Sequence, residues 1–297
     1  MNFDALAFRV YVAVEGLGLT HLLRRVPRLA RNASQLRKFV LSDTPKWRKV
    51  RSGISEGLWM QLQLPKQGRL WRGEHELRLQ KAILAAISPE TVFYDIGAHE
   101  GSIALGVAQR LNRSGCVVAF EADPQNAQSL RSNAERNNLT SSLQVVSRAV
   151  WSYSTPGIGF RRGGTQSTHG GVEADGQHPV LSGGEMIAIP AIALDDFVAS
   201  GGRVPQLVKI DVEGGEYEVL CGGTELFTKH RPIIVVEVHH ERAASQIGPW
   251  LTRVRYASRW IVPAERFPSC LFAWPEEFDG AAWMRRSGAE AEPCQTT

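Results

Sequence analysis

Short runs of apolar residues alternate with helical patterns through the middle of the chain. Five runs are typical of strands buried on both faces, at residues 92–96, 116–120, 143–150, 207–211 and 233–238. Between them, residues 102–111 carry apolar side chains at helical spacing, and Asp123 before Pro124 predicts a helix start. Because strands that alternate with helices indicate parallel βαβ units, we expect an α/β fold with a doubly wound, mostly parallel sheet.

The segments on either side of this region follow other patterns. Residues 59–64 alternate between apolar and polar side chains, as in a strand, and residues 65–68 (PKQG) then indicate a turn. Residues 151–186 are rich in Gly, Ser and Thr, which predicts a loop or an irregular hairpin. The other expected elements are loosely amphipathic helices over residues 5–40, a helix over 76–87, short helices near 195 and 217–220, and extended segments over 187–194, 259–262 and 269–274.

We expect three parts in the chain: a basic helical N-terminal extension (residues 1–55), a large α/β domain (residues 56–275) and a C-terminal tail (residues 276–297). Of all residues, 43% are hydrophobic and 22% are charged, which excludes a wholly disordered or fibrous protein. The four cysteines lie far apart and form no CxxC pair, which favours a reducing compartment over a secreted disulfide framework. No run of 18 apolar residues is present, so we expect a cytoplasmic protein.

Positive charge is concentrated near the N-terminus. Residues 1–60 contain eleven Lys or Arg and four acidic residues, so their net charge of +7 exceeds the +4 of the whole chain. A basic surface helix can contact nucleic acid, an anionic membrane surface or an acidic partner. A solvated helical extension explains the same pattern without a partner. If residues 1–55 bind anything, we expect an anionic membrane or an acidic partner rather than a specific nucleic acid.

Candidate ligand-binding residues follow the first two buried strands. In a doubly wound sheet, ligands bind beyond the carboxyl ends of the strands, where the strand order reverses. Residues 95–101 (DIGAHEG) have the pattern DxGxxxG, in which glycine lets a ligand approach the backbone. Asp95 suits a ligand with an ammonium group, and the helix after this turn offers N–H groups to a carboxylate. Glu121 ends the second strand, where a carboxylate can accept hydrogen bonds from two ribose hydroxyls.

Together, these two signals favour an adenosine ligand without a pyrophosphate, which points to S-adenosyl-L-methionine. A GxGxxG dinucleotide fingerprint needs a further glycine that residues 95–101 lack, so a nicotinamide-dependent oxidoreductase is the weaker alternative. The structural alternatives are a glycine turn that only packs a strand on a helix and an acid that only caps a helix. Asp123 already serves as the expected cap next to Glu121.

Several of these segments resemble the FkbM family of methyltransferases. The similar segments are residues 71–76 (WRGEHE), 95–101 (DIGAHEG), 120–124 (FEADP), 194–197 (LDDF), 209–216 (KIDVEGGE), 231–232 (RP) and the strand that leads to Glu237. The similarity covers about residues 55–240, and KIDVEG is its most specific part. The resemblance implies a class I methyltransferase (Rossmann-like) fold that binds S-adenosyl-L-methionine and usually methylates a hydroxyl oxygen.

The resemblance also assigns cofactor contacts to individual residues. These contacts are Asp95, Gly97 and Gly101 for the methionine end, Glu121 for the ribose and Ala149 for the adenine. Many relatives have a small polar or acidic residue shortly after the alanine, where this chain has Val150 and Trp151. We expect His99 to shape the cofactor pocket, and Glu76 either to contact the methionine end or to cap a helix.

The acceptor side of the site is expected after the fourth and fifth strands. Because Asp211 ends a buried strand, a catalytic or acceptor-orienting role is open for it beside a structural one. Glu237 and His239 face the same side of the next strand and, near Asp211, would form a general base or a metal site with oxygen and nitrogen ligands. A hydrogen-bonded, noncatalytic His239 is the alternative. For Glu213 and Glu216, we expect a place in a first helical turn, which the helix macrodipole alone explains.

We therefore expect an S-adenosylmethionine-dependent methyltransferase that methylates a hydroxyl of a small-molecule, glycan or lipid-like acceptor, with Asp211 and His239 as the catalytic residues. The alternative from another class is a noncatalytic Rossmann-like module that docks through its basic N-terminus. An enzyme for nucleic-acid amino groups would carry an Asn/Asp-Pro-Pro-aromatic turn after the fourth strand, where this chain has DVEG. The sequence names neither the acceptor nor the oligomeric state, and it leaves the need for a metal open.

Overall fold

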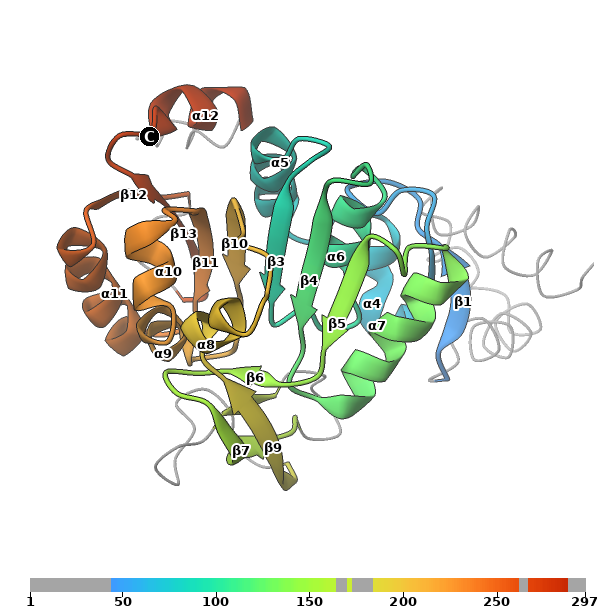
Figure 1. Cartoon of the computed structure of the whole chain (residues 1–297). Helices are drawn as coiled ribbons and strands as arrows, with labels where there is room; N and C mark the ends of the chain where they lie inside the picture. Colours follow the sequence, from blue (N-terminus) through green and yellow to red (C-terminus); the bar gives the residue numbers. More distant parts are fainter. Residues whose placement is uncertain (1–43, 164–169, 173–183, 262–266, 288–297) are drawn as a thin grey trace, which may run out of the picture.

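The computed structural model describes residues 44–163, 170–172, 184–261 and 267–287, which contain a central seven-stranded sheet of order β12-β13-β11-β10-β3-β4-β5 (Figure 1). From β11 to β5, five neighbouring strands run parallel, and β13 pairs antiparallel with β11. The chain builds from β3 to β5 on one side and then returns to place β10 and β11 on the other. The strand order therefore reverses between β3 and β10, which confirms the predicted doubly wound, mostly parallel sheet.

The expected apolar runs form most of the strands of this sheet. Its strands are β3 (Val92–Ile96), β4 (Cys116–Phe120), β5 (Leu143–Val146), β10 (Leu207–Ile210), β11 (Ile233–Val238), β12 (Tyr256–Trp260) and β13 (Ser269–Pro275). The helices around it are α4 (Leu64–Trp71), α5 (Leu77–Ala86), α6 (Ser102–Ala108), α7 (Pro124–Arg136), α8 (Leu194–Ala199), α9 (Glu216–Cys221), α10 (Thr224–Lys229), α11 (Glu241–Arg253) and α12 (Gly280–Ser287).

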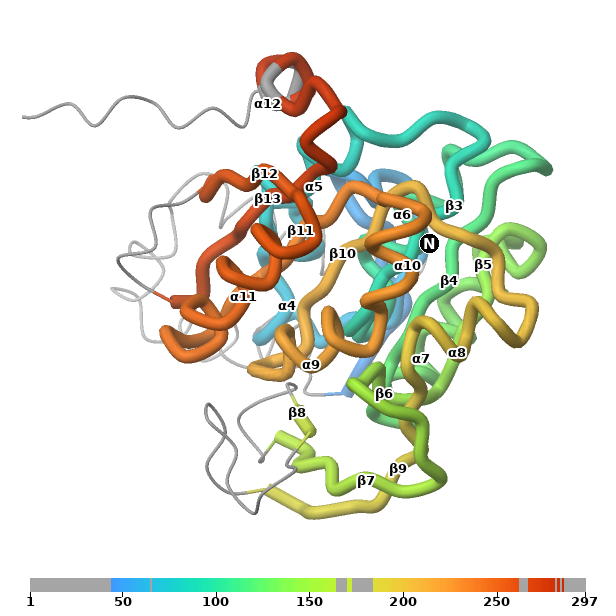
Figure 2. Tube along the Cα trace, turned by 60° about the vertical axis from the view of Figure 1, so that its left-hand side comes forward, coloured from blue at the N-terminus to red at the C-terminus, as the bar shows by residue number. Residues whose placement is uncertain are grey.

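Helices cover both faces of the sheet, as Figures 1 and 2 show. Phe93 of β3 belongs to a core formed with α4 to α7 and α12, whereas the next residue, Tyr94, belongs to a core formed with α8 to α11. Both side chains have no exposed surface. Because successive side chains of a strand point to opposite faces, a strand between two helical layers has apolar side chains at most positions. This explains why β4 is a continuous apolar run and why β3 is apolar except at Asp95.

A second, four-stranded sheet lies beyond the carboxyl ends of the parallel strands, at the bottom of Figure 1. Its strands are β6 (Ala149–Val150), β9 (Met186–Ile192), β7 (Thr155–Arg161) and β8 (Gly171–Val172), in this order. The predicted single strand over residues 143–150 is wrong, because the chain leaves the central sheet after Val146 and enters the second sheet at Ala149. The predicted irregular hairpin over residues 151–186 corresponds in part to β7 and β8.

The chain before the central sheet also packs on the core. Strands β1 (Lys46–Lys49) and β2 (Trp59–Leu62) form an antiparallel pair, and β2 confirms the expected strand. Instead of the predicted free turn, residues 65–68 lie in α4, which has a proline in its first helical turn and a kink at Gln67, where the φ of −108° and ψ of 23° are not helical. The helices expected over residues 5–40 lie outside the described residues. None of the described helices is long and apolar enough to cross a membrane.

Candidate active site

A cavity of about 770 Å³ opens at the carboxyl ends of β3, β4, β10 and β11, where the strand order reverses. Its size lies within the range of about 300–1,000 Å³ that is common for small-molecule sites. The second sheet contributes Phe160 and Val172 to the opposite wall. Eight of the nine site residues predicted from the sequence line this cavity, and Gly101 does not. The structure thus brings together residues from positions 76 to 239.

Packing fixes the two glycines of the turn after β3. Gly97 has a φ of +75°, and a Cβ atom there would lie 1.7 Å from the carbonyl oxygen of Asp211. Gly101 has a φ of +90°, and its Cβ would lie 2.7 Å from Cγ of Leu130 in α7. L-residues rarely adopt such φ values. Gly97 therefore lets the ends of β3 and β10 meet, whereas Gly101 packs α6 against α7 outside the cavity.

Lys209 joins the residues that end β3 and β10. Its Nζ lies 3.1 Å from Oδ1 of Asp95 and 3.2 Å from Oδ2 of Asp211, and it donates a hydrogen bond of 3.0 Å to the carbonyl oxygen of Gly97. Burial raises the pKa of Asp95, and the charge of Lys209 opposes this shift. Burial lowers the pKa of Lys209, but the charges of Asp95 and Asp211 outweigh it and hold that pKa above its usual value. The three groups form one charged unit at the cavity wall, in which Asp95 and Lys209 are buried and Asp211 faces the cavity.

The backbone holds the Glu121 carboxylate in place at the end of β4. Its Oε2 accepts a hydrogen bond of 2.7 Å from the N–H of His99, and its Oε1 accepts one of 2.9 Å from the N–H of Asp123. The residue is 6% exposed and lines the cavity. The Asp123 side chain caps α7 by accepting from the N–H of Gln125, which confirms the predicted cap. Each Glu121 oxygen keeps a further lone pair for a ligand hydroxyl.

The wall beyond Glu121 is made by the first residues of the second sheet. Ala149, at the start of β6, lines the cavity together with Val150 and Trp151. Trp151 is 7% exposed, and a Cβ on Gly215 would lie 2.6 Å from its Cζ3. Its ring therefore packs against the loop after β10. Val150 and Trp151, which differ from the small polar or acidic residue of many relatives, thus form an apolar wall.

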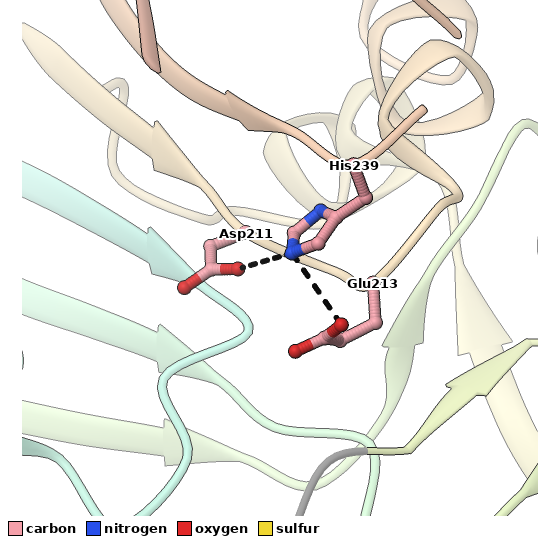
Figure 3. Close-up of side chains that lie close together, drawn as sticks. All are labelled: Asp211, Glu213 and His239. Atoms are coloured by element: carbon pink, nitrogen blue, oxygen red, sulfur yellow. Dashed lines mark ion pairs between the residues drawn. The ribbon is translucent and has the colours of Figure 1, made fainter. Parts of the chain in front are cut away.

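Five ionisable side chains gather on the side of the cavity formed by β10 and β11: Glu76, Asp211, Glu213, Glu237 and His239. Oxygen atoms of Glu76, Asp211 and Glu237 lie within 4.8 Å of one another. In the second group, Nε2 of His239 lies 3.6 Å from Oδ1 of Asp211 and 3.4 Å from Oε2 of Glu213 (Figure 3). We call these five residues the acidic cluster.

His239 is held from behind by a carboxylate with no exposed surface. Its Nδ1 lies 2.7 Å from Oε1 of Glu216, which also accepts a 2.7 Å hydrogen bond from the N–H of Gly214. Burial lowers the pKa of the imidazole, but the hydrogen bond to Glu216 and the charges of Asp211 and Glu213 outweigh it and raise the pKa to about 9. At neutral pH both ring nitrogens therefore carry a proton, and the positively charged ring stabilises the carboxylates in front of it.

Burial changes two further carboxyl groups of the acidic cluster. It raises the pKa of Glu76 to about 8 and that of Glu237 to about 7, with the charge of Asp211 as the next cause in both cases. Glu76 precedes α5 with a φ of 52° and makes no side-chain capping hydrogen bond. The helix-capping alternative for Glu76 is therefore wrong, and the side chain faces the cavity instead. Glu237 and His239 lie on the same side of β11, as their spacing predicts.

Three residues to which the sequence assigned no role at the site are part of this arrangement. Lys209 connects the two strand ends, Glu213 faces His239, and Glu216 hydrogen-bonds to it. Both glutamates were expected in a first helical turn: Glu216 does begin α9, but the expectation is wrong for Glu213, which lies in the loop before that helix. A lysine within a run of buried strand residues was the available signal for Lys209, since such a charge requires partners.

Comparison with known proteins adds a family match to this geometry. The methyltransferase FkbM domain matches residues 95–258, which contain all the predicted site residues except Glu76. The hexuronic acid methyltransferase AglP of Haloferax volcanii is 31% identical over 169 residues. These residues are 57% of this chain and 63% of that protein, so the match spans less than two thirds of its length.

Two solved structures are similar to this chain at low sequence identity. The methyltransferase FkbM from Methylobacillus flagellatus KT is 17% identical, with a TM-score of 0.47 over 63% of this chain and 44% of that chain. The O-methyltransferase from Bacillus cereus, solved in complex with SAH, is 16% identical, with a TM-score of 0.41 over 66% of this chain and 78% of that chain.

Proposed function

Because the chain belongs to the FkbM methyltransferase domain family, we propose that its cavity binds S-adenosyl-L-methionine and that the protein methylates a hydroxyl of a glycan or another small acceptor. The relative from Haloferax volcanii acts on hexuronic acid, which makes a sugar with a carboxylate the first acceptor to test. The observation that carries the proposal is the Glu121 carboxylate, fixed by two backbone N–H groups at the cavity wall.

The residues around the cavity fit this cofactor. Each oxygen of Glu121 has one backbone donor and one free lone pair, which suits a pair of neighbouring ribose hydroxyls. The turn that contains Gly97 and His99 lies beside Glu121 and would hold the methionine end, with Asp95 beneath it as the charge that favours an ammonium group. Ala149 and the apolar wall beyond it would receive the adenine ring. Gly101 would not contact the cofactor and would act only by letting α6 pack against α7.

The acidic cluster is the proposed acceptor side of the cavity. S-Adenosylmethionine supplies a methyl group on a sulfonium, so the protein has to orient the acceptor oxygen and remove its proton. Asp211 faces the cavity from the end of β10, and the proton of the acceptor hydroxyl passes to a carboxylate of the cluster, with Asp211 as the first candidate. Protonated His239 keeps the Asp211 carboxylate charged and oriented.

Two measurements on the full chain test the proposal. Calorimetric titration with S-adenosylmethionine should give saturable binding. Incubation with glycans that contain hexuronic acid and with labelled cofactor should transfer one methyl group, and the product should resist mild alkali, because a methyl ether is stable where a methyl ester is not. Binding of the cofactor without transfer to any sugar would favour the noncatalytic alternative, and absence of binding would reject the proposed cofactor site.

A further inference from the structure

We propose that Asp211, Glu213 and His239 form a site for a divalent transition-metal ion on the acceptor side of the cavity. One carboxylate oxygen from each acid and a ring nitrogen of the histidine lie within 4.8 Å of one another. The side chains come from the end of β10, the loop after it and the end of β11. Figure 3 shows both carboxylates turned toward Nε2 of the imidazole.

The distances between these atoms fit ligands around an ion. Nε2 of His239 lies 3.4 Å from Glu213 Oε2 and 3.6 Å from Asp211 Oδ1. Both separations exceed the usual N–H···O length of about 2.7–3.2 Å. Metal–ligand bonds of about 2.0–2.2 Å place neighbouring ligand atoms roughly 3.0–3.5 Å apart at octahedral or tetrahedral angles. The two separations from Nε2 are therefore close to those between neighbouring ligands of one ion, and the carboxylate oxygens of the two acids lie within 4.8 Å of each other.

His239 is oriented as metal-binding histidines are. Its side chain is 7% exposed, and its Nδ1 is held at 2.7 Å by Glu216, which has no exposed surface. A metal-bound histidine almost always donates its other ring N–H to a carboxylate or a carbonyl, which fixes the ring and raises its basicity. This contact lies outside the three proposed ligands and independently directs Nε2 between the two acids. The ion would take the place of the proton that Nε2 carries in the metal-free cavity.

The chemistry of the three ligands selects the type of ion. Lys209 pairs with Oδ2 of Asp211, whereas Oδ1 is the oxygen that faces Nε2 of His239. Two carboxylates balance two positive charges, and a mixed set of imidazole and carboxylate ligands suits Mn²⁺, Fe²⁺ or Zn²⁺ better than softer ions. Three protein ligands leave coordination positions open toward the cavity, as in catalytic metal sites.

An ion at this position would bind the acceptor oxygen and lower the pKa of the acceptor hydroxyl. This role rests on the proposed function. With Asp211 engaged by the ion, Glu237 remains as a carboxylate that can take the hydroxyl proton. Glu76 and Glu237 also form, with Asp211, a second group of three possible ligand atoms. That group contains no histidine, so we assign the ion to the group of Asp211, Glu213 and His239. Substitutions of Glu213 and of Glu237 distinguish the two groups.

Metal binding itself provides the test. Full-length protein is freed of metal with a chelator and titrated separately with MnCl₂ and ZnCl₂ in a calorimeter. We expect one ion per chain for at least one of the two metals. Glu213→Gln and His239→Gln should weaken its binding by at least about tenfold, and Glu216→Gln by roughly 10- to 100-fold. His230→Gln removes an exposed histidine after α10 and should bind like the unchanged chain. Glu237→Gln should retain the ion.

Three results would overturn the proposal: no saturable binding of either ion, unchanged affinity in Glu213→Gln, or loss of the ion in Glu237→Gln instead. If His239→Gln fails to fold, Glu213→Gln decides, because its side chain is replaced by one of equal size. Each metal-free sample is also titrated with S-adenosylmethionine. Cofactor binding without metal binding rejects the metal site and leaves the proposed function standing. Metal binding without cofactor binding supports the metal site and rejects the proposed cofactor site.

Discussion

Lys209 and Asp95 form a buried ion pair across two neighbouring parallel strands, with Nζ 3.1 Å from Oδ1. The two residues are direct partners in the pairing of β10 with β3. Their side chains are 5% and 0% exposed. The same ammonium pairs with Asp211, so a single lysine connects the turn proposed for the cofactor with the acidic cluster proposed for the acceptor. The geometry of both halves therefore depends on this one side chain.

Lys209→Met should destabilise the protein strongly. The methionine fills similar space but leaves Asp95 buried without its cation, and breaking a buried ion pair typically costs about 3–5 kcal/mol. The free energy of unfolding in urea measures this loss. Lys229→Met is the matched control, because Lys229 pairs with Glu225 on the surface, where both side chains are more than half exposed. We expect its unfolding midpoint to be unchanged. Equal effects of the two substitutions would contradict the structural role of Lys209.

Gly97→Ala should cost more stability than Gly201→Ala. Both glycines have a positive φ, of +75° and +100°, so both alanines lose about 1–2 kcal/mol to backbone strain. A Cβ at position 97 also meets the carbonyl oxygen of Asp211, whereas one at position 201 has no atom within 4 Å. Overpacking adds about 1–3 kcal/mol or more at position 97. Thermal unfolding of both variants measures the difference, and equal midpoints would show that β3 and β10 do not approach so closely.

Asp211→Asn should slow methyl transfer while cofactor binding is retained. The amide keeps the size of the side chain but can neither take a proton nor supply an anionic ligand. Loss of a general base typically reduces the rate by about 10²–10⁴. The rate is measured with a methyl acceptor found in the glycan experiment, and the dissociation constant of S-adenosylmethionine is measured in parallel. Transfer at the unchanged rate would leave Asp211 as a structural partner of Lys209.

Deletion of residues 1–43 should leave a folded protein, whereas deletion of residues 1–50 should not preserve its stability. The longer deletion removes β1, which pairs with β2, and Val50, which is 3% exposed in the core. The shorter deletion removes none of the described core. Thermal unfolding compares the two truncations.

Binding to anionic vesicles then tests the charge of the N-terminal segment: weaker binding after deletion of residues 1–43 supports a membrane contact, and equal binding argues against it.

The sequence predicted the strands of the central sheet well, because strands between two helical layers are apolar at most positions. Asp123 and Pro124 likewise predicted the start of α7. The pattern missed α11, which contains Gly248 and Pro249, two residues that normally interrupt helices. It also joined β5 and β6 into one strand, because an apolar run does not show where a chain passes from one sheet to another.

The candidate site was predicted less completely than the fold. Strand ends identified Glu121, Asp211 and His239 as residues of one cavity, since carboxyl ends of parallel strands lie at the same edge of a sheet. The roles of Lys209 and Glu216 depend on which strand or loop is the spatial neighbour. Lys209 and its partner Asp95 are 114 residues apart in the sequence, and Glu216 and its partner His239 are 23 residues apart, so no local pattern encodes these contacts.

Titration of the full chain with S-adenosylmethionine, repeated with Glu121→Ala, decides whether the cavity is a cofactor site. The substitution removes an acceptor for two ribose hydroxyls, and hydrogen bonds to a charged group are worth about 1.5–3 kcal/mol, so the dissociation constant should rise roughly 10- to 150-fold. Glu135→Ala, an exposed change on α7, should leave it unaltered. Failure of the unchanged chain to bind, or equal affinity in a folded Glu121→Ala variant, would contradict the assignment of Glu121 to the cofactor.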